Sequence, residues 1–405
     1  MQNNVNTSNI HNNCILCGNC SAICPKGAII FDNIIERVVI DKNLCIKCGL
    51  CLKNCPAVLK DRKENTLLGH LENIYAGFSN NEEIRYKSAS GGLLTQTLKY
   101  LTENKMVDKV LITDFCSDSL QAESFFTDDI QKIINACGSK YQIVNVNKAL
   151  KAVLKDNLKY AYVGLPCHHV GLEKFIKENP KINDRILYKF AICCSHNSNI
   201  KIIDYVCQFL KIKKEDIKSI KYRGDGWPEY LTITTINDEK LKFPKNYWND
   251  LFLSFFYTPK QCFKCTDFCG ENSDISFADA WLEEYTSIQS DGYNLVFSHT
   301  QKGEKLLQEM FQSNEITLNK HSSADVIKSQ IIGLFYKKHI YKSLKPGDLL
   351  LKTIIKLNSK ISKYGFFKFV NPLFLKYYFY ILNKLFINKN LCKYREKILH
   401  ENSNC

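Results

Sequence analysis

One cysteine pattern, present twice near the amino-terminus, constrains the fold of this chain more than any other feature. Each copy reads C-x2-C-x2-C-x3-C-P, and the copies occupy residues 14–25 and 45–56. Three cysteines separated by two residues can ligate three corners of one cubane, while the fourth, on the following helical turn, points to the other cluster. The spacing therefore predicts two 4Fe-4S clusters. One is expected to take Cys14, Cys17, Cys20 and Cys55 as ligands, and the other Cys45, Cys48, Cys51 and Cys24.

Zinc is the alternative ligand for clustered cysteines, but it commonly pairs two short C-x2-C knuckles separated by a dozen or more residues. Three cysteines in close succession with a trailing Cys-Pro, given twice, do not fit that pattern. Gly18 and Gly49 lie where the backbone must approach a cluster closely. Short strands are expected at residues 28–30 and 39–41. Residues 1–60 resemble bacterial two-cluster ferredoxins, whose clusters each carry one electron and perform no substrate chemistry.

The number of cysteines and the first residues also indicate the cellular compartment. Of 405 residues, 19 are cysteine, and a secreted protein would use so many in disulfides. The first thirteen residues, which are polar and rich in asparagine, contain neither a basic n-region nor an apolar h-region. We therefore expect a cytoplasmic protein whose cysteines are reduced, and the eight between Cys14 and Cys55 have the distribution of a metal site.

A second domain is expected over residues 70–330, after a charged linker at residues 60–66. Apolar residues at helical spacing alternate with short apolar runs, which predicts helices packed around a mixed sheet. The expected helices cover residues 92–103, 148–154 and 170–177, and the expected strands cover 108–114, 160–164 and 186–192. A more strand-rich stretch follows, with strands expected at 219–222, 231–236, 240–243 and 275–278.

The tail, residues 341–405, has a different character. Residues 351–405 contain eleven Lys or Arg and two Glu, a net charge of +9 out of +14 for the whole chain. Lysines recur beside apolar residues every three or four positions from Leu351 to Lys363, which predicts an amphipathic basic helix. Because the positive charge is concentrated there, we do not expect nucleic-acid binding.

The most apolar segment of the chain follows, at residues 365–388. Lys368, Pro372, Lys376 and Lys384 interrupt it, so it is a poor candidate for a membrane span. Its aromatic residues are expected to pack on the main domain. The alternative is a peripheral contact with anionic lipid at the inner face of the membrane.

Several segments of the second domain carry residues suited to a cofactor. The turn at residues 87–93, Lys-Ser-Ala-Ser-Gly-Gly-Leu, opens a helix whose free amides suit a phosphate. The others are Gly-Ser-Lys-Tyr at 138–141, Gly-Leu-Pro-Cys-His at 164–168, Ile-Cys-Cys-Ser-His-Asn at 192–197, Tyr-Arg-Gly-Asp-Gly-Trp at 222–227, Cys-Phe-Lys-Cys at 262–265 and Asp-Ile-Ser-Phe-Ala-Asp at 274–279. In this order they resemble the beta-subunit family of coenzyme F420 hydrogenases and dehydrogenases, over roughly residues 70–320.

This resemblance implies FAD and a third 4Fe-4S cluster in the second domain. The cysteines that match the family are Cys167, Cys194, Cys262 and Cys265, with Cys193 and Cys269 as neighbouring alternatives and zinc as an alternative metal. For the flavin, it points to Ser88, Ser90, Gly91 and Gly92 around the phosphates, with Lys140 and Arg223 as charge partners. The sequence departs from the family at His168 and His169, where a glutamine and an apolar residue are usual.

Together these features predict an α+β protein. Its parts are a two-cluster ferredoxin module, a mixed α/β flavin-binding domain and a helical basic tail. The expected activity is that of an FAD- and iron-sulfur-dependent oxidoreductase, which passes electrons from a ferredoxin or reduced deazaflavin through 4Fe-4S clusters to FAD and on to an organic acceptor. The alternative is a non-catalytic electron-relay subunit of a hydrogenase or dehydrogenase complex, docked to a redox partner protein. No catalytic residue can be identified, and His168, His169 and His196 are only candidates for proton delivery.

Overall fold

The computed structural model describes residues 14–32, 37–58, 67–116, 120–227, 230–286, 291–341, 346–363, 377–378 and 388–402. The expected polar lead, the charged linker at 60–66 and most of the aromatic segment at 365–388 lie outside the described residues. Membrane contact through that segment stays a prediction. Among the described residues, no helix combines the length and the apolar character that crossing a bilayer requires.

The amino-terminal module, residues 14–58, is built from two similar halves. Each cysteine loop leads into a short helix, α2 (Asn19–Ile23) or α3 (Leu50–Lys53), and both helices follow a glycine in the left-handed region, Gly18 at φ 97° and Gly49 at φ 75°. Strands β1 (Ile29–Asp32) and β2 (Arg37–Ile40) pair antiparallel, with Ile29 opposite Ile40. These are the two short strands that the sequence predicts. The module ends in the helical turn η1 (Pro56–Val58).

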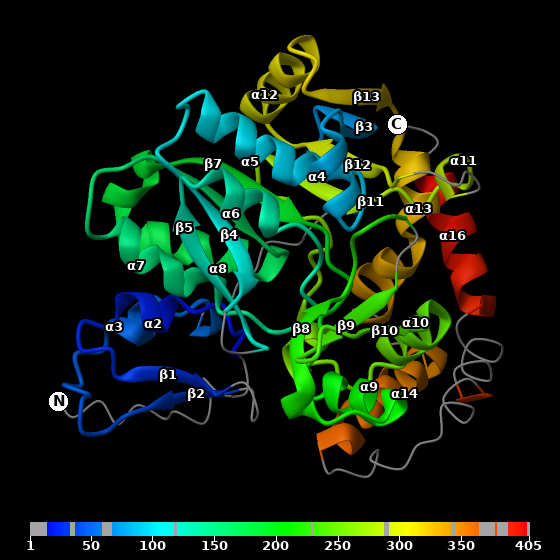
Figure 1. The fold of residues 1–405 in the computed structure, drawn as a ribbon, viewed down its shortest axis with the longest axis horizontal. Coiled ribbons are helices and arrows are strands. Elements are labelled where there is room, and N and C mark those ends of the chain that lie inside the picture. The colour runs from blue at the N-terminus through cyan, green and yellow to red at the C-terminus, as the bar shows by residue number, and fades with distance from the viewer. Residues whose placement is uncertain are drawn as a thin grey trace.

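A mixed eight-stranded sheet forms the centre of the molecule (Figure 1). Its order is β13-β3-β12-β11-β7-β6-β4-β5, and β11, β7, β6 and β4 run parallel while the remaining neighbours are antiparallel. The strands are β3 (Asn73–Ser79), β4 (Lys109–Phe115), β5 (Ala122–Thr127), β6 (Tyr160–Gly164), β7 (Ile186–Ile192), β11 (Ile275–Asp279), β12 (Asn294–Ser298) and β13 (Ile316–Lys320). The mixed sheet expected from the sequence is confirmed.

Helices cover both faces of this sheet because successive strand residues point to opposite sides. In β4, Val110 and Ile112 pack with residues of α5 and α12, whereas Leu111 packs on the other face with residues of α7 and α8. One layer contains α4 (Glu82–Lys87), α5 (Leu93–Glu103), α6 (Ile130–Asn135) and α12 (Gln301–Gln312). The other contains η2 (Val146–Ala149), α7 (Leu150–Val153), α8 (Pro166–Glu178) and η3 (Pro180–Arg185), and, beside β11 and β12, α13 (Ser323–Leu334).

A smaller antiparallel sheet of β8 (Ile217–Lys221), β9 (Leu231–Thr235) and β10 (Lys240–Phe243) has its own core with α9 (Ile202–Leu210) and α10 (Lys245–Leu253). The turns η4 (Lys214–Asp216), η5 (Lys260–Lys264) and α11 (Glu283–Thr286) complete this half of the chain. The sequence predicted all three strands, but it did not indicate that they leave the central sheet.

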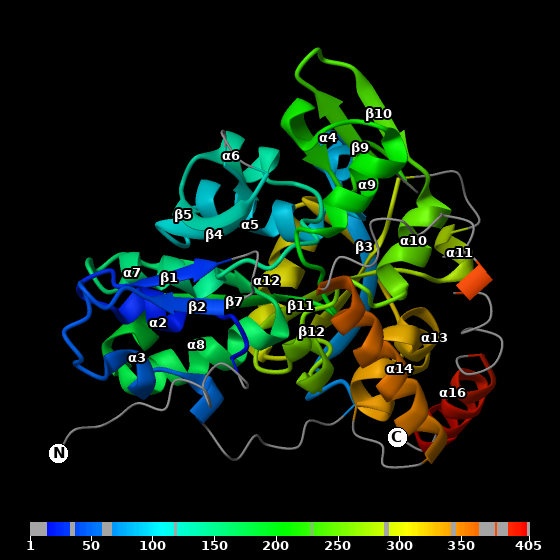
Figure 2. The same ribbon diagram turned by 90° about the horizontal axis from the view of Figure 1, so that it is seen from below.

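The carboxyl-terminal helices pack against the end of the sheet that is distant from the amino-terminal module (Figure 2). A π-helical turn, η6 (Phe335–Ile340), continues α13, and α14 (Pro346–Lys363) and α16 (Asn388–Asn402) follow. Leu351 and Ile355 of α14 and Tyr394 and Ile398 of α16 are buried in one core with α13. The described part of the tail therefore contributes helices to the main body of the protein.

Candidate functional site

The carboxyl ends of the parallel strands gather the residues that the sequence singled out. Cys167 follows β6, Cys193 and Cys194 follow β7, and Asp279 ends β11. β3 runs parallel to β11 and leads through α4 to the turn at residues 88–92. Because parallel strands end at the same edge of a sheet, these segments meet there, which is where ligands bind in α/β folds.

The first quartet is Cys14, Cys17, Cys20 and Cys55. Burial raises the pKa of Cys14, Cys17 and Cys20, to about 12 for Cys20, and charge repulsion from Cys55 adds to the increase at all three. The Leu16 amide donates to Cys14 Sγ at 3.4 Å. The chain therefore brings these four sulfurs together, in the grouping that the spacing predicts.

The second quartet is Cys24, Cys45, Cys48 and Cys51. Burial raises the pKa of Cys51, and Cys48, Cys24 and Cys45 add to the increase, so the four lie together. Cys20 of the first quartet also interacts with Cys51. Unlike the first quartet, this one is close to solvent: Cys48 is exposed, as are the nearby Leu44 and Ile46.

The first quartet rests directly on α8 of the second domain. The Asn19 amide, which is 1% exposed, donates to Gly171 O at 2.7 Å and to Asn54 O at 3.0 Å. Asn147 Nδ2 donates to Asn19 Oδ1 at 2.8 Å. A Cβ added to Gly171 would lie 3.0 Å from Cys17 Sγ, so a side chain there would separate the module from the helix.

One helical turn connects the first quartet to the cysteine that follows β6. Cys167 lies at the start of α8, and Gly171, which contacts Cys17, follows one turn later. The buried Tyr162 interacts with both Cys17 and Cys167: burial raises its pKa, and each of the two thiols adds to the increase. Its hydroxyl donates to Asn147 Oδ1. Within α8, Cys167 and the residue that contacts Cys17, Gly171, are therefore about one turn apart, on the order of 6 Å along the helix axis.

The third quartet is Cys167, Cys194, Cys262 and Cys265, the set implied by the family resemblance. Burial raises the pKa of Cys167, and the other three thiols add to the increase. Burial also raises the pKa of Cys194 to about 11 and that of Cys262 to about 12. β6, β7 and η5 thus bring four sulfurs from three distant segments to one place, and four thiolates are the ligand number of a cubane.

A buried lysine accompanies the third quartet, and no sequence pattern indicated it. Lys337 in η6 is 2% exposed, and its ammonium hydrogen-bonds Cys265. Burial alone would lower its pKa, but the charges of Cys265, Cys194 and Cys262 outweigh burial and hold the pKa above its ordinary value. A cation against four thiolates suits a site whose occupant is negatively charged as a whole. The residues present therefore fit a 4Fe-4S cluster.

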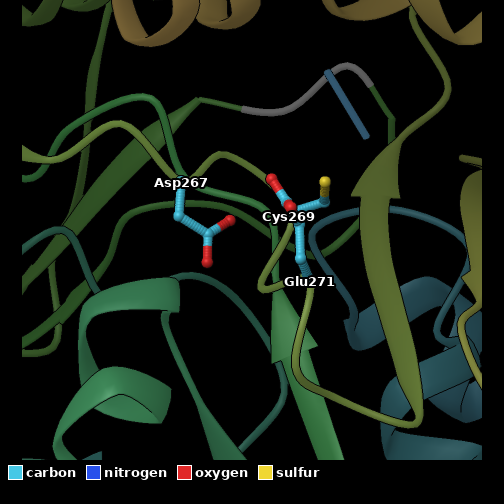
Figure 3. A group of neighbouring side chains, drawn as sticks. All are labelled: Asp267, Cys269 and Glu271. Atoms are coloured by element: carbon cyan, nitrogen blue, oxygen red, sulfur yellow. The ribbon is translucent and has the colours of Figure 1, made fainter. Parts of the chain in front are cut away.

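Cys193 and Cys269, the alternative ligands for this site, have other neighbours. Cys193 interacts with Cys269 and Asp267, and Cys269 is fully buried, with its Sγ 3.3 Å from Leu68 O. Asp267, Cys269 and Glu271 form a group of potential metal ligands on the loop between η5 and β11 (Figure 3). Both carboxylates already have partners in the protein, because Asp267 accepts the Gly270 amide at 2.8 Å and Glu271 pairs with Lys338 at 2.7 Å.

The turn expected at the flavin phosphates is buried and held by its neighbours. Ser90 Oγ donates to Tyr293 O at 2.5 Å, and Ser88 Oγ lies 3.5 Å from Cys137 Sγ. Gly91 fits against Gly77 O, where an added Cβ would lie at 2.5 Å. Gly92, at φ 78°, precedes α5, and the Leu93 amide at the start of that helix donates to Asn294 Oδ1 at 3.1 Å. The first amide of α5 therefore already has an acceptor, and an anion at this turn would depend on the positive end of the helix dipole and on the nearby cations.

The two expected charge partners lie at this turn, and both already contact protein oxygens. Arg223 donates to Asp279 Oδ2 at 2.6 Å and to Ala89 O at 2.5 Å. Lys140 donates to Ala136 O at 2.6 Å and lies 3.6 Å from Asp114 Oδ1. Arg223 thus joins the turn at 88–92 to the end of β11, and an anion there would share its guanidinium with Asp279.

Two tryptophans extend this region. The rings of Trp227 and Trp281 are 4.8 Å apart, and the Arg223 guanidinium lies 5.4 Å and 5.7 Å from them. Lys245 Nζ lies at similar distances from both rings. Trp281 is 42% exposed, so an aromatic surface with two cations is accessible beside the glycine turn. A phosphate-bearing aromatic cofactor fits this combination of groups. The sequence identified Trp227 but not Trp281.

The three histidines considered for proton delivery each contact a backbone segment. Burial lowers the pKa of His168 to about 3, that of His169 to about 4 and that of His196 to about 3, so all three are neutral at physiological pH. His168 Nδ1 accepts the Leu165 amide at 3.1 Å, and His169 Nε2 and His196 Nε2 lie 2.9 Å and 3.1 Å from the carbonyls of Phe190 and Phe252. Each ring therefore fixes a loop beside the third quartet.

Comparison with protein families gives matches within residues 13–324, which cover the amino-terminal module and the central sheet. Residues 157–324 match the model for the carboxyl-terminal part of the coenzyme F420 hydrogenase/dehydrogenase beta subunit, and residues 74–151 match the model for the amino-terminal part of that subunit. Residues 13–58 match the 4Fe-4S dicluster domain.

The individual proteins that match this chain have low sequence identity to it. The chain is 26% identical over 314 residues to the coenzyme F420-dependent sulfite reductase of Methanocaldococcus jannaschii, a match that covers 72% of this chain and 45% of that protein, less than half its length. It is 25% identical over 322 residues to one subunit of the F(420)H(2) dehydrogenase of Methanosarcina mazei, covering 76% and 84% of the two chains. Among solved structures, a chain of the F420-reducing [NiFe] hydrogenase complex from Methanosarcina barkeri shares the fold, with a TM-score of 0.51 and 17% identity over 75% of this chain and 94% of that one.

Proposed function

Since the chain belongs to the coenzyme F420 hydrogenase/dehydrogenase beta-subunit family and carries a 4Fe-4S dicluster domain, we propose that it is an iron-sulfur flavoprotein oxidoreductase. It accepts electrons from a reduced ferredoxin or a reduced deazaflavin, passes them along the three quartets to FAD, and delivers them to an organic acceptor. The contact between Cys17 and Gly171, one helical turn from Cys167, supports this proposal most strongly.

The three quartets follow one another from the surface to the interior. The second quartet includes the exposed Cys48, the first interacts with it through Cys20 and Cys51, and the first and third flank one turn of α8. These contacts between neighbouring quartets support the transfer of single electrons along the series. Asn19, Asn147 and Gly171 hold the module in the position that maintains the second of these contacts.

The third quartet and the proposed flavin site are joined by one helical run. In α13, Ser329 Oγ accepts the Trp281 amide at 2.9 Å and Gln330 Nε2 donates to Asp279 O at 2.5 Å, while Lys337 of η6 contacts Cys265. Gln330 and Lys337 are two helical turns apart, on the order of 10 Å. A bound flavin would supply the conversion between one-electron transfer and two-electron chemistry. Arg223 and Lys140 would position it and compensate its negative charge.

The experiment is to measure flavin and iron in anaerobically purified protein, with Arg223→Gln beside Lys221→Gln as a matched control. We expect one FAD and about twelve iron atoms per chain, from three cubanes. Arg223→Gln should lose at least about tenfold in flavin affinity, because a charge-assisted contact is removed. Lys221→Gln should bind normally, since Lys221 pairs with Asp225 near the surface. A wild-type protein that binds no flavin would contradict the proposal that it is a flavin-dependent enzyme.

A second candidate is an electron-relay subunit of a larger complex. Leu44 and Ile46 beside the second quartet are 49% and 57% exposed, and such apolar residues next to an accessible redox site suit a docking partner. The two candidates differ in one observable. The enzyme oxidises or reduces a soluble dye or deazaflavin alone, whereas a relay subunit does so only when its partner is added.

A further inference from the structure

Lys337 has an unusual environment for a lysine. It is nearly inaccessible, and its charged neighbours include the sulfurs of all four cysteines of the third quartet. The next residue, Lys338, is also buried, but it pairs with Glu271 at 2.7 Å. A buried ammonium is costly unless an anion compensates its charge. For Lys338 that anion is a carboxylate, and for Lys337 it is the third quartet.

The helix that carries Lys337 is irregular at this point. Gln330 in α13 has φ −111° and ψ 16°, and the following turn, Phe335–Ile340, is π-helical. A π-helical turn contains an extra residue and changes the direction of the side chains, and such turns are frequent at functional sites. Here it places Lys337 at the third quartet while Lys338 faces the loop after η5.

The hydroxyl of Tyr341 provides a second, independent observation about this site. Its ring is 7% exposed, and its hydroxyl is buried without a hydrogen-bond partner among the described residues. Its charged neighbours include Cys262, Cys265 and Cys194. A buried hydroxyl without a partner is unfavourable, and bound metal clusters supply sulfur acceptors. The hydroxyl is therefore placed to donate to a sulfur at this site.

We propose that Lys337 and Tyr341 raise the reduction potential of the cluster held by the third quartet, so that electrons from the amino-terminal module collect there. The inference rests on the proposed function, because it requires a cluster at that site. Reduction adds one negative charge to the cluster, and a fixed ammonium and a donated hydrogen bond stabilise the reduced form more than the oxidised form. Hydrogen bonds to sulfur and local charge are the groups by which proteins tune such potentials.

The test is a potentiometric titration of the anaerobic full-length protein, followed by EPR. Lys337→Met should shift the reduction equilibrium of one cluster toward the oxidised form by at least about tenfold, which is 59 mV for a one-electron couple. Tyr341→Phe should shift the same cluster in the same direction by a smaller amount. Lys337→Arg should stay near wild type because it keeps the charge. The double variant Lys338→Met/Glu271→Gln, which removes a neighbouring buried pair together, should leave all potentials unchanged.

The outcomes separate this inference from the proposed function. Tyr341→Phe removes only a hydroxyl, so it is expected to fold and to keep its iron even if Lys337→Met does not. The inference would be overturned if Tyr341→Phe kept its full iron content and its reduction potential, and if Lys337→Met either kept its potential or proved unstable. That result would leave the proposed function unaffected. A wild-type iron content of about eight atoms would overturn both, because the third cluster would be absent.

Discussion

At Cys193 and Cys194, two adjacent cysteines follow the same strand but have different surroundings. The Cys193 thiol interacts with Cys269, whereas the Cys194 thiol interacts with Cys265 and Lys337, and Asp267 interacts with both. Successive residues at the end of a strand point to opposite sides, so only one of the pair can face a given site. This geometry favours Cys194 as the ligand in the third quartet and leaves Cys193 in the packed interior.

This pair provides a matched test of the ligand set. We expect Cys194→Ala to lower the iron content from about twelve to about eight atoms per chain, because one cubane loses a ligand. Cys193→Ala should keep about twelve. Iron and acid-labile sulfide, measured on anaerobic protein, check the prediction. Equal iron loss in the two variants would contradict the assignment.

At the residue scale, the sequence predicted which cysteines lie near one another better than it predicted their surroundings. The cysteine spacing and the family resemblance named three groups of four, and the structure brings each group together. Nothing in the sequence distinguishes Lys337 from Lys338, because their roles depend on the rotation of one irregular turn. Likewise, the partners of Arg223, which are Asp279 and Ala89, are distant in sequence and only the fold brings them together.

At the scale of elements, α8 connects the amino-terminal module to the central sheet. Its first turn carries Cys167, its second contacts Cys17 at Gly171, and near its end Glu178 lies 3.3 Å from Lys53 of the module. One helix therefore fixes the distance between two quartets. This arrangement makes the small size of Gly171 necessary.

Gly171→Ala tests that requirement. Alanine favours a helix over glycine by about 0.5–1 kcal/mol, but its Cβ would lie 2.6 Å from Asn147 Nδ2 and 2.9 Å from Cys17 Cβ. Overpacking of this kind costs about 1–3 kcal/mol, so the clash dominates and the module should be displaced. We expect lower stability and slower electron transfer to the third quartet, measured by rapid-mixing kinetics. Lys177→Ala, an exposed position on the same helix, serves as the control; equal rates in the two variants would refute the role of this contact.

A second element-scale prediction concerns Glu304 of α12, which ties that helix to the sheet. Its carboxylate accepts hydrogen bonds from Tyr75 at 2.6 Å and Ser298 at 2.5 Å. Burial alone would raise the pKa of Glu304, but these bonds and that from Gln308 hold it below the ordinary value of 4.5. The contribution to stability is therefore present above that value and is lost as the pH falls through the lower folded pKa.

We expect Glu304→Gln to destabilise the protein at neutral pH by about 1–2 kcal/mol, because a charged acceptor is lost. The difference from wild type should shrink as the pH falls below 4.5. Denaturant unfolding of both proteins at several pH values measures it. A difference that does not change with pH would show that the charge of Glu304 is not the stabilising factor.

The sequence predicted some elements closely and missed others. β6, β7 and β10 have the bounds that the apolar runs predicted. β3, β5, β12 and β13 were not identified, although they complete the sheet. β3 contains Gly77 and Ser79 and pairs with strands more than two hundred residues away, so its conformation depends on tertiary pairing more than on local preference.

At the scale of the whole molecule, the quartets and the proposed flavin site occupy successive positions across the structure. The amino-terminal module lies at one end, and the helices α13, α14 and α16 lie at the other (Figure 2). Between them, the edge of the sheet where the parallel strands end carries the third quartet and the turn at 88–92. If the proposed function holds, the docking surface, the metal sites and the flavin site follow one another in the order that electron transfer requires.

The most direct test of this account is the EPR spectrum of the fully reduced, anaerobic protein. If all three quartets hold adjacent 4Fe-4S clusters, the signal should integrate to about three spins per chain and show interaction between clusters, since each cluster carries one electron. Cys194→Ala should reduce it to about two spins. A wild-type spectrum of only two spins, unchanged in Cys194→Ala, would contradict the account.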